Sequence, residues 1–186
     1  MKDEEDLIRA ALSGESQAFG QLVQRYQDRL FTAMVSIVGS TDEAEDVVQE
    51  AFIQAYIKLD TFQMNSRFFT WLYRIAFNYA LSRRRKNRNQ VSLDQTRETT
   101  GNDPTDHREG PDANMVRDES VLQVRRAMER LSDDHRMILV LREMQGMSYE
   151  HIAEILEIEI GTVRSRLNRA RSQLKTNLEQ LPDWKY

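Results

Sequence analysis

The chain has 186 residues, of which 40% are hydrophobic and 30% are charged, and its formal net charge is −4. This composition is typical of a folded, helix-rich protein and argues against wholesale disorder. There is no cysteine, which excludes a disulfide scaffold and cysteine-ligated zinc and fits a reducing compartment.

The beginning of the chain and its apolar runs bear on location. Residues 1–6 are acidic and lack the basic-then-apolar order of a signal peptide. No apolar run approaches the roughly 20 residues that a membrane-spanning helix needs. We therefore expect a cytoplasmic protein with no direct membrane insertion.

Charge is distributed unevenly along the chain. Residues 1–60 carry twelve acidic and five basic side chains, whereas residues 61–90 carry seven basic side chains and no acidic one. Residues 160–175 carry four arginines and one lysine, again without an acid. Two basic segments in an acidic protein indicate phosphate-bearing partners that bind at two places.

Helical spacing of apolar residues dominates the first half of the chain. A short helix is expected near 5–13, and apolar residues recur three and four apart over 19–37. A helix over 41–59 should begin at a capping box formed by Ser40 and Glu43. After a turn-like segment, Ser66 is the expected cap of a long helix that runs to about Arg85. These four helices predict a first helical bundle over residues 1–88.

Residues 89–118 lose this spacing, because glycine, proline and polar residues accumulate and apolar residues nearly vanish. We predict a flexible, acidic linker there. Apolar spacing resumes at Val121, and a helix that follows Ser132 should stop at Gly146, a residue suited to a left-handed C′ position. The predicted fold class is all-α: two small helical bundles joined by a flexible linker, the second over residues 119–186.

The second bundle contains a predicted helix-turn-helix. A helix capped by Ser148 is followed, after a brief turn, by a helix over about 159–178. An inward stripe runs from Val163 to Leu174, and the opposite face is basic and polar. Arginine pairs bidentately with guanine and asparagine with adenine, while a helix N-terminus suits a phosphate. The predicted DNA-binding residues on this helix are Thr162, Arg164, Ser165, Asn168, Arg169, Arg171 and Ser172. A merely solvated basic face is the alternative, which the capped preceding helix and the missing acids disfavour.

The basic helix of the first bundle interleaves cations with aromatic rings. Cations neutralise phosphates, rings stack on unpaired bases, and polar loop residues before the helix can hydrogen-bond a base edge. At helical spacing most of the rings should be core, including Phe69 and Tyr73, whereas Trp71 lies off that stripe. The predicted DNA-binding residues here are Gln63, Asn65, Ser66, Arg67, Trp71, Arg74, Asn78, Arg83, Arg84 and Lys86.

The helix over 41–59 has an acidic polar face, which would repel DNA. A functional partner at this face should therefore be a protein. Ile53 and Ile57 lie beside the polar face and outside the buried stripe, which is a slight indication of an interface. A solvated surface is the alternative.

Three stretches resemble hallmark sequences of the extracytoplasmic-function sigma factors of the sigma-70 family. They are DVVQEAF at 46–52, FTWLYRIAFN at 69–78 and GTVRSRL at 161–167. The resemblance extends over nearly the whole chain and keeps the order of the segments. It implies an alternative sigma factor, not an enzyme and without a cofactor, that brings core RNA polymerase to promoters and helps to melt the DNA.

The resemblance also implies partners and roles. The basic helix and its preceding loop would capture the minus-ten element, and the helix-turn-helix would read the minus-thirty-five element. The second bundle would sit on the polymerase β flap, and an anti-sigma factor, which is often membrane-anchored in relatives, is expected. The residues that would dock on the β′ coiled coil of the polymerase are Asp46, Gln49, Glu50, Ile53 and Gln54.

Two other classes of protein remain open from the sequence. A repressor or response-regulator output protein with this helix-turn-helix would bind duplex DNA alone as a dimer, but such proteins usually carry a ligand or receiver domain. A metal-assisted nuclease would have to use the acids at 42–50. No clustered histidine, glycine-rich phosphate loop or nucleophile–base pair accompanies those acids.

Overall fold

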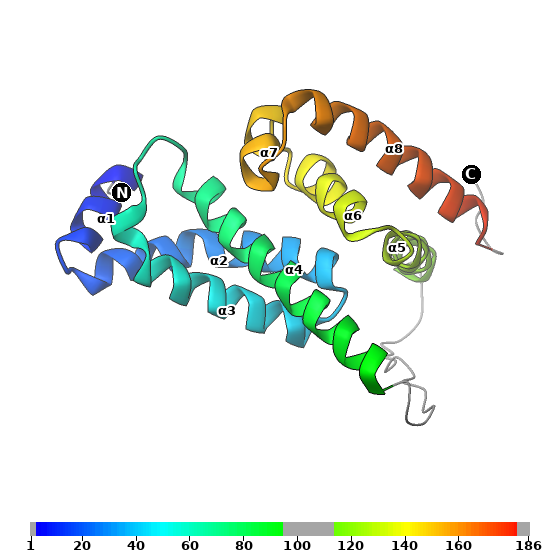
Figure 1. The fold of residues 1–186 in the computed structure, drawn as a ribbon, viewed down its shortest axis with the longest axis horizontal. Coiled ribbons are helices and arrows are strands. Elements are labelled where there is room, and N and C mark those ends of the chain that lie inside the picture. Colours follow the sequence, from blue (N-terminus) through cyan, green and yellow to red (C-terminus); the bar gives the residue numbers. More distant parts are fainter. Residues whose placement is uncertain (1–2, 95–113, 182–186) are drawn as a thin grey trace.

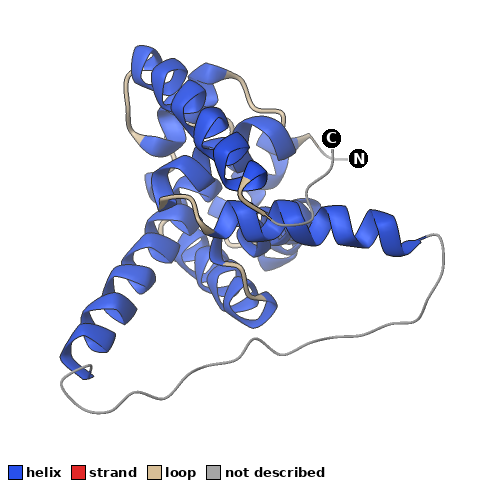
Figure 2. Ribbon diagram, turned by 90° about the vertical axis from the view of Figure 1, so that its right-hand side faces the viewer, coloured by secondary structure: helices blue, strands red, loops and turns tan. Residues whose placement is uncertain are grey.

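The computed structural model describes residues 3–94 and 114–181, and these residues form helices and turns without a strand (Figures 1 and 2). In chain order the helices are α1 (Glu4–Leu12), α2 (Ser16–Val38), α3 (Thr41–Ile57), the 3-10 helix η1 (Leu59–Thr61), α4 (Phe68–Asp94), α5 (Asn114–Glu129), α6 (Asp133–Leu139), the π-helical turn η2 (Val140–Met144), α7 (Tyr149–Leu156) and α8 (Ile160–Glu179). The predicted all-α fold class is confirmed.

Helices α1 to α4 form the N-terminal domain, in which α2 packs on α1 and α3, and α4 packs on α3. Gly39 ends α2 at φ 85°, a left-handed conformation in which a Cβ atom would be strained. The predicted cap of α3 is confirmed, because the Ser40 hydroxyl accepts from the N–H of Glu43 at 3.4 Å. The core includes Leu22, Leu30, Ala44 and Leu72, which are all fully buried.

The start of α4 differs from the sequence prediction. The helix begins at Phe68, two residues after Ser66, and the N–H of Phe68 donates to the carboxylate of Glu4 at 3.4 Å. The hydroxyl of Tyr26 donates to the same carboxylate. An acidic residue from α1 therefore satisfies the first turn of α4, where a negative charge is favoured by the helix dipole. Sequence spacing cannot reveal this cap because it comes from 64 residues away.

Helices α5 to α8 form the C-terminal domain, in which α8 packs against α5, α6 and α7. Ser132 and Ser148 cap α6 and α7 with their hydroxyls. The prediction for Gly146 is confirmed, because its φ of 65° lies in the left-handed region just after η2. In η2 the helix widens, and the N–H of Gln145 donates to the carbonyl of Val140 at 3.0 Å.

The described helices extend into both ends of the segment predicted as a linker. Helix α4 continues to Asp94, and α5 begins at Asn114. Residues 87–94 contain no glycine or proline, and arginine, leucine and glutamine support helix. The remainder of the predicted linker, 95–113, lies outside the described residues.

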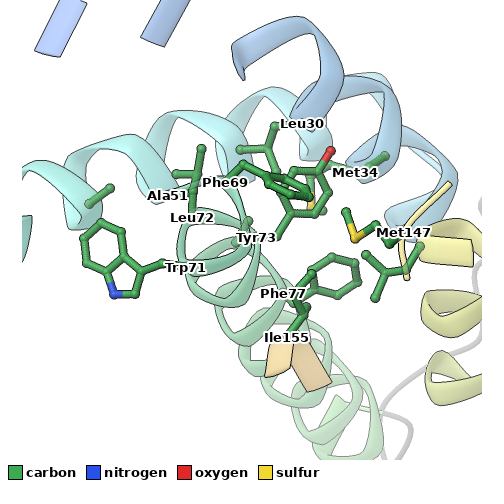
Figure 3. Close-up of a cluster of buried hydrophobic side chains, with 14 of the residues drawn as sticks. Leu30, Met34, Ala51, Phe69, Trp71, Leu72, Tyr73, Phe77, Met147 and Ile155 are labelled. Carbon is green, nitrogen blue, oxygen red and sulfur yellow. The ribbon is translucent and has the colours of Figure 1, made fainter. Parts of the chain in front are cut away.

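The two domains pack against one another. Helix α7 lies on α4, and α2 contacts both α6 and η2 (Figure 1). Figure 3 shows Met147 and Ile155 of the C-terminal domain beside Phe77 of α4, so one continuous apolar core serves both domains. Arg136 of α6 is 3% exposed and donates across the boundary to the carbonyl of Ile37 at 2.8 Å.

Candidate nucleic-acid interface

The outward face of α8 is the first candidate DNA-binding surface. Val163, Leu167 and Ala170 point into the domain and are buried, as the spacing predicted. The predicted DNA-binding residues share the opposite face: Thr162 is half-buried at the first turn, and Arg164, Ser165, Asn168, Arg169, Arg171 and Ser172 are exposed. Helix α8 thus presents a row of hydrogen-bond donors with the dimensions of a major-groove helix.

Two of the α8 arginines are held by carboxylates of the same domain. The guanidinium of Arg171 lies 2.6 Å from the carboxylate of Glu143 on η2. Arg166, which is not on the outward face, pairs with Asp134 of α6 at 3.2 Å. Glu143 therefore holds Arg171 in an ion pair at the edge of the outward face.

The turn between α7 and α8 is tight. Glu157 occupies the left-handed region at φ 53°, and the N–H of Ile158 donates to the carbonyl of Ala153 at 3.0 Å. Glutamate in this conformation carries a steric cost that glycine would not. The predicted helix-turn-helix is therefore formed by α7, this turn and α8.

The loop before α4 and the first turn of α4 surround a small pocket of about 260 Å³. Four predicted DNA-binding residues line it together: Asn65, Ser66, Trp71 and Arg74. The pocket combines amide, hydroxyl and guanidinium groups with an indole wall, which suits an unpaired base and its phosphate. Gln63 accepts from the side-chain amide of Asn65 at 3.3 Å and supports the same loop.

Thr70 is a lining residue that sequence reasoning missed. Its side chain is 3% exposed, and among the described residues its hydroxyl has no hydrogen-bond partner. A buried hydroxyl without a partner costs free energy, and this one lies in the wall of the pocket. The threonine falls within the stretch FTWLYRIAFN, but helical spacing alone gives it no role in the site.

Trp71 is more buried than its position off the core stripe predicted. It is 8% exposed and packs against the rings of Phe62 and Phe68 at 5.2 and 5.8 Å. Phe62 comes from the loop after η1, which folds over this side of α4. The indole therefore forms a fixed wall of the pocket, and only its margin is open to a ligand.

A second pocket, of about 340 Å³, adjoins the first on the side of α1. Asn65 and Ser66 line both pockets, and Arg67 lines the larger one together with Glu4 and Glu5. The C-terminal domain contributes to both, because Glu154 of α7 lines each of them and His151 lines the larger. The ring of His151 also lies edge-on to Phe69 at 6.1 Å.

The basic end of α4 lies away from these pockets. Asn78 and Lys86 are exposed. Arg83 pairs with Asp46 of α3 at 2.8 Å, and this hydrogen bond raises the pKa of the Arg83 guanidinium. Arg84 pairs with Asp133 of the C-terminal domain at 2.6 Å. The predicted residues of α4 therefore divide into a pocket group and a distal cationic group.

The predicted protein-binding face lies on α3, on the side away from the C-terminal domain. Asp46, Gln49 and Ile53 are exposed, and half-buried Gln54 donates to half-buried Glu50 at 2.9 Å. An apolar strip continues beyond it: Ile53 is 45% exposed, Tyr56 52% and Ile57 64%. Sequence reasoning placed Tyr56 in the core. Its ring instead packs edge-on against Phe19 at 5.0 Å and leaves half its surface open.

Metal-ligand clusters and membrane-spanning helices are both absent from the described residues. Over 3–94 and 114–181, no three histidine or acidic side chains come together as metal ligands would. None of the helices in the same ranges combines the length and apolar character that crossing a bilayer requires.

Two family models match this architecture. The model for sigma-70 region 2 matches residues 22–90, and the model for sigma-70 region 4 matches residues 122–174. The first match contains the loop, the pocket and most of α4. The second contains the helix-turn-helix.

Sequence similarity to several sigma factors extends over almost the entire chain. The RNA polymerase sigma-H factor of Pseudomonas aeruginosa is 37% identical over 185 residues, which are 97% of this chain and 96% of that protein. The ECF RNA polymerase sigma-E factor of Escherichia coli K12 is 38% identical and covers 94% of each chain. SigW of Bacillus subtilis is 33% identical and covers 94% of this chain and 96% of its own.

Solved structures share the fold. The sigma factor RpoE of Bartonella quintana, in complex with the anti-sigma factor NepR, superposes with a TM-score of 0.69 at 29% identity and covers 87% of this chain and 97% of its own. CnrH in complex with the cytosolic domain of CnrY gives a TM-score of 0.68 at 27% identity over 95% of this chain and 97% of CnrH.

Proposed function

The chain belongs to the extracytoplasmic-function RNA polymerase sigma factors, and we propose that it joins core RNA polymerase, selects promoters by their minus-ten and minus-thirty-five elements and helps to open the DNA. The observation that carries this proposal is the separation of tasks among three faces. The outward face of α8 is cationic, the first turn of α4 borders a base-sized pocket, and α3 presents acidic and apolar groups. The protein acts by binding, and the polymerase performs the chemistry.

Helix α8 reads the minus-thirty-five element in the duplex. Arg164, Asn168 and Arg169 are exposed along one side and reach base edges from the major groove. Thr162, together with the free N–H groups at the start of α8, holds a phosphate and sets the register. Arg171 joins this contact when it leaves Glu143. Ser165 and Ser172 supply shorter polar contacts.

The pocket at the start of α4 receives one unpaired base of the minus-ten element. Asn65 and Ser66 hydrogen-bond the base edge, the margin of Trp71 contacts its face, and Arg74 neutralises the adjacent phosphate. Binding an unstacked base stabilises the melted strand relative to the duplex. Further along α4, Asn78, Arg83, Arg84 and Lys86 follow the neighbouring backbone.

The polymerase docks on two surfaces. The α3 face around Gln49, Glu50 and Ile53 binds the β′ coiled coil, and the exposed apolar strip suits a protein partner better than DNA. The C-terminal domain binds the β flap. Helix α5 supports this second contact, since Val121 is 62% and Leu122 49% exposed.

We also propose an anti-sigma partner and a cytoplasmic location. RpoE of Bartonella quintana was solved in complex with the anti-sigma factor NepR, and CnrH was solved in complex with the cytosolic domain of CnrY. The apolar strip on α3 is a surface that such an antagonist would share with the polymerase. Attachment of the antagonist to the membrane would couple the chain to signals from outside the cytoplasm.

Run-off transcription tests the proposal directly. Purified chain and core polymerase are incubated with a genomic promoter library, and the start sites are mapped. We expect a discrete set of starts that share two sequence blocks and that core alone does not use. If the chain neither binds core nor creates new starts, the proposed function is wrong. If it binds duplex DNA tightly as a dimer without core, the repressor alternative replaces it.

A further inference from the structure

Two carboxylates of the C-terminal domain face the proposed DNA-binding pocket of the N-terminal domain. Glu154, in the last turn of α7, lines both pockets beside Asn65 and Ser66. Glu157, in the following turn, lies 3.6 Å from the guanidinium of Arg74. A nucleic acid at this place would offer its negative charge to the same groups.

We infer that the closed packing of the two domains is an autoinhibited state, in which the acidic end of α7 occupies the place of single-stranded promoter DNA on α4. The inference rests on the proposed minus-ten function of α4 and adds how that site is regulated. Release requires the C-terminal domain to leave α4. The pocket residues and Arg74 are then free of these carboxylates.

A second arginine of α4 is engaged in the same way. Arg84 pairs with Asp133 of α6 at 2.6 Å and donates to the carbonyl of Ile37 at 3.3 Å. Arg74 and Arg84 were both assigned to DNA from the sequence, and a carboxylate of the C-terminal domain meets each of them. In the closed molecule, carboxylates therefore take the place of DNA phosphates at two positions of α4, about ten residues apart.

The other two functional faces stay open in the closed molecule. Helix α8 has α5, α6 and α7 as its packing partners, and α3 has α2, α4 and η1, so the residues that are exposed on these two helices stay accessible. Closure is thus selective: it places carboxylates at the proposed site for melted DNA and leaves the polymerase-binding face and the duplex-reading helix accessible. A sigma factor in this state can meet the polymerase before it can hold single-stranded DNA.

Several contacts that hold the domains together are polar and can be replaced by contacts with a binding partner. Arg29 of α2 donates to the side chain and the backbone carbonyl of Gln145 at 2.9 and 2.7 Å, and the Tyr73 hydroxyl lies 3.1 Å from the same side chain. The Arg74–Glu157 pair is largely exposed, at 42% and 65%, so it stabilises the closed state only slightly. Polymerase contacts that separate the domains can therefore shift the equilibrium.

Locking the domains tests the inference, and the natural absence of cysteine makes a specific lock straightforward. Arg29→Cys and Gln145→Cys place one thiol on each side of the boundary, at residues with no assigned role in binding. A bismaleimide with an internal disulfide joins them, and a reducing agent opens the tether again. The matched control is the same double variant capped with a monofunctional maleimide. The probe is a short fluorescent single-stranded DNA of randomised sequence.

We expect the locked chain to bind the probe on the order of tenfold more weakly than the capped chain, and to recover after reduction. Equal binding by the locked, capped and reduced chains would overturn the inference. Run-off transcription by the capped chain separates the two proposals. If it transcribes and binds the probe but locking has no effect, only autoinhibition fails. If it does neither, the proposed function fails and autoinhibition with it.

Charge removal at the carboxylates provides an independent arm in the otherwise unaltered chain. Glu154→Gln with Glu157→Gln should tighten binding of the same probe by about threefold or more, because the closed state loses its mimic of DNA charge. Glu159→Gln with Glu179→Gln removes the same charge from exposed positions of the same domain and should leave the affinity unchanged. An equal gain in both double variants would mean general electrostatics and would contradict the inference.

Discussion

Arg136 is the most highly connected polar side chain of the C-terminal domain described above. Its guanidinium donates to the carbonyls of Met128, Glu129 and Leu131 at 2.9, 2.7 and 3.2 Å, and to that of Ile37 at 2.8 Å. Helix C-termini leave carbonyls without partners inside the helix. One buried arginine thus satisfies the end of α5 and, in the closed molecule, the end of α2.

We predict that Arg136→Met destabilises the protein by about 2–4 kcal/mol, because several buried carbonyls lose their donor at once. Arg136→Lys should recover only part of this, since an ammonium lacks the planar fork of donors. Urea unfolding measures both effects. Arg130→Met, at an exposed position nearby, is the control and should stay within about 0.5 kcal/mol of the parent chain. An equally stable Arg136→Met variant would show that the network contributes nothing.

Tyr26 makes stability depend on alkaline pH. Burial, and then the hydrogen bond and charge of Glu4, raise the pKa of Tyr26 from 10.0 to about 12. The folded state therefore favours the neutral hydroxyl. This stabilisation is complete below the unfolded pKa of 10.0 and is lost as the pH rises through about 12.

Thermal unfolding as a function of pH checks this effect. The midpoint of the parent chain should fall between about pH 10 and 12, and Tyr26→Phe should flatten the decline, because no hydroxyl remains to ionise. Tyr73, whose pKa is also raised by burial, should leave a residual slope that the additional change Tyr73→Phe removes. Identical pH profiles for parent and variants would contradict the assignment.

Residues with a local signal were predictable from the sequence, and residues with a distant partner were not. Ser40, Ser148 and Gly146 act within a few residues of the chain, so spacing was sufficient to assign them. Arg136 reads as an ordinary polar residue of a short helix, because its acceptors come from α5 and α2. Thr70 carries no local signal, because the pocket that it lines is made by a loop whose path sequence spacing does not define.

At the scale of whole elements, α8 matches its prediction closely. The inward stripe and the exposed row follow directly from the period of the helix. What the period does not show is which outward arginines are already paired. Arg164 and Arg169 are exposed without a carboxylate partner among the contacts described, whereas Arg171 is held by Glu143. The three arginines should therefore differ in what they contribute to DNA binding.

We predict that Arg164→Ala costs the polymerase complex about 1–3 kcal/mol at the minus-thirty-five element and relaxes the preference at one base pair. Arg171→Ala should cost less, because DNA must first displace Glu143. Glu143→Gln should accordingly tighten binding by up to about 1 kcal/mol. Titration of the complex against promoters with single base-pair changes measures all three. A uniform loss on every promoter would make Arg164 a phosphate contact.

The ends of elements were the least predictable part of the fold. Helix α4 starts later than the Ser66 signal and continues beyond Arg85 to Asp94, because the loop at its start is fixed by Phe62 and Glu4, and no breaker follows until Gly101. The interior of each helix was predictable, because several apolar residues at helical spacing indicate the same helix.

At the scale of the whole molecule, the α3 face is accessible in the closed state. We predict that Glu50→Lys or Gln49→Ala weakens binding to core polymerase by about 1 kcal/mol or more, with no change in promoter preference. Competition for core against a labelled parent chain measures the loss. Asp28→Lys, an exposed charge reversal on α2, is the control. Normal competition by the α3 variants would rule out this face as the docking surface.

The domain organisation could be predicted from the sequence, but the packing between the domains could not. Composition and apolar spacing divide the chain into two helical modules and an intervening segment. The contact between α4 and α7 depends on a tilt and a register for which no local pattern exists. Four of the residues predicted to bind DNA line one pocket, yet Glu154 joins them there only through that contact.

The Asp46–Arg83 pair, at 2.8 Å, joins the proposed polymerase-binding face of α3 to the distal cationic end of α4. If the polymerase binds the carboxylate of Asp46, the guanidinium of Arg83 becomes available to a phosphate. If a phosphate binds Arg83 first, the carboxylate of Asp46 becomes available to the polymerase. The two binding events are then reciprocally coupled through a shared ion pair, with a cooperativity of up to about 1 kcal/mol for so exposed a pair. Promoter binding would then increase the affinity of the sigma factor for the polymerase. Polymerase binding would increase its affinity for the promoter by the same factor.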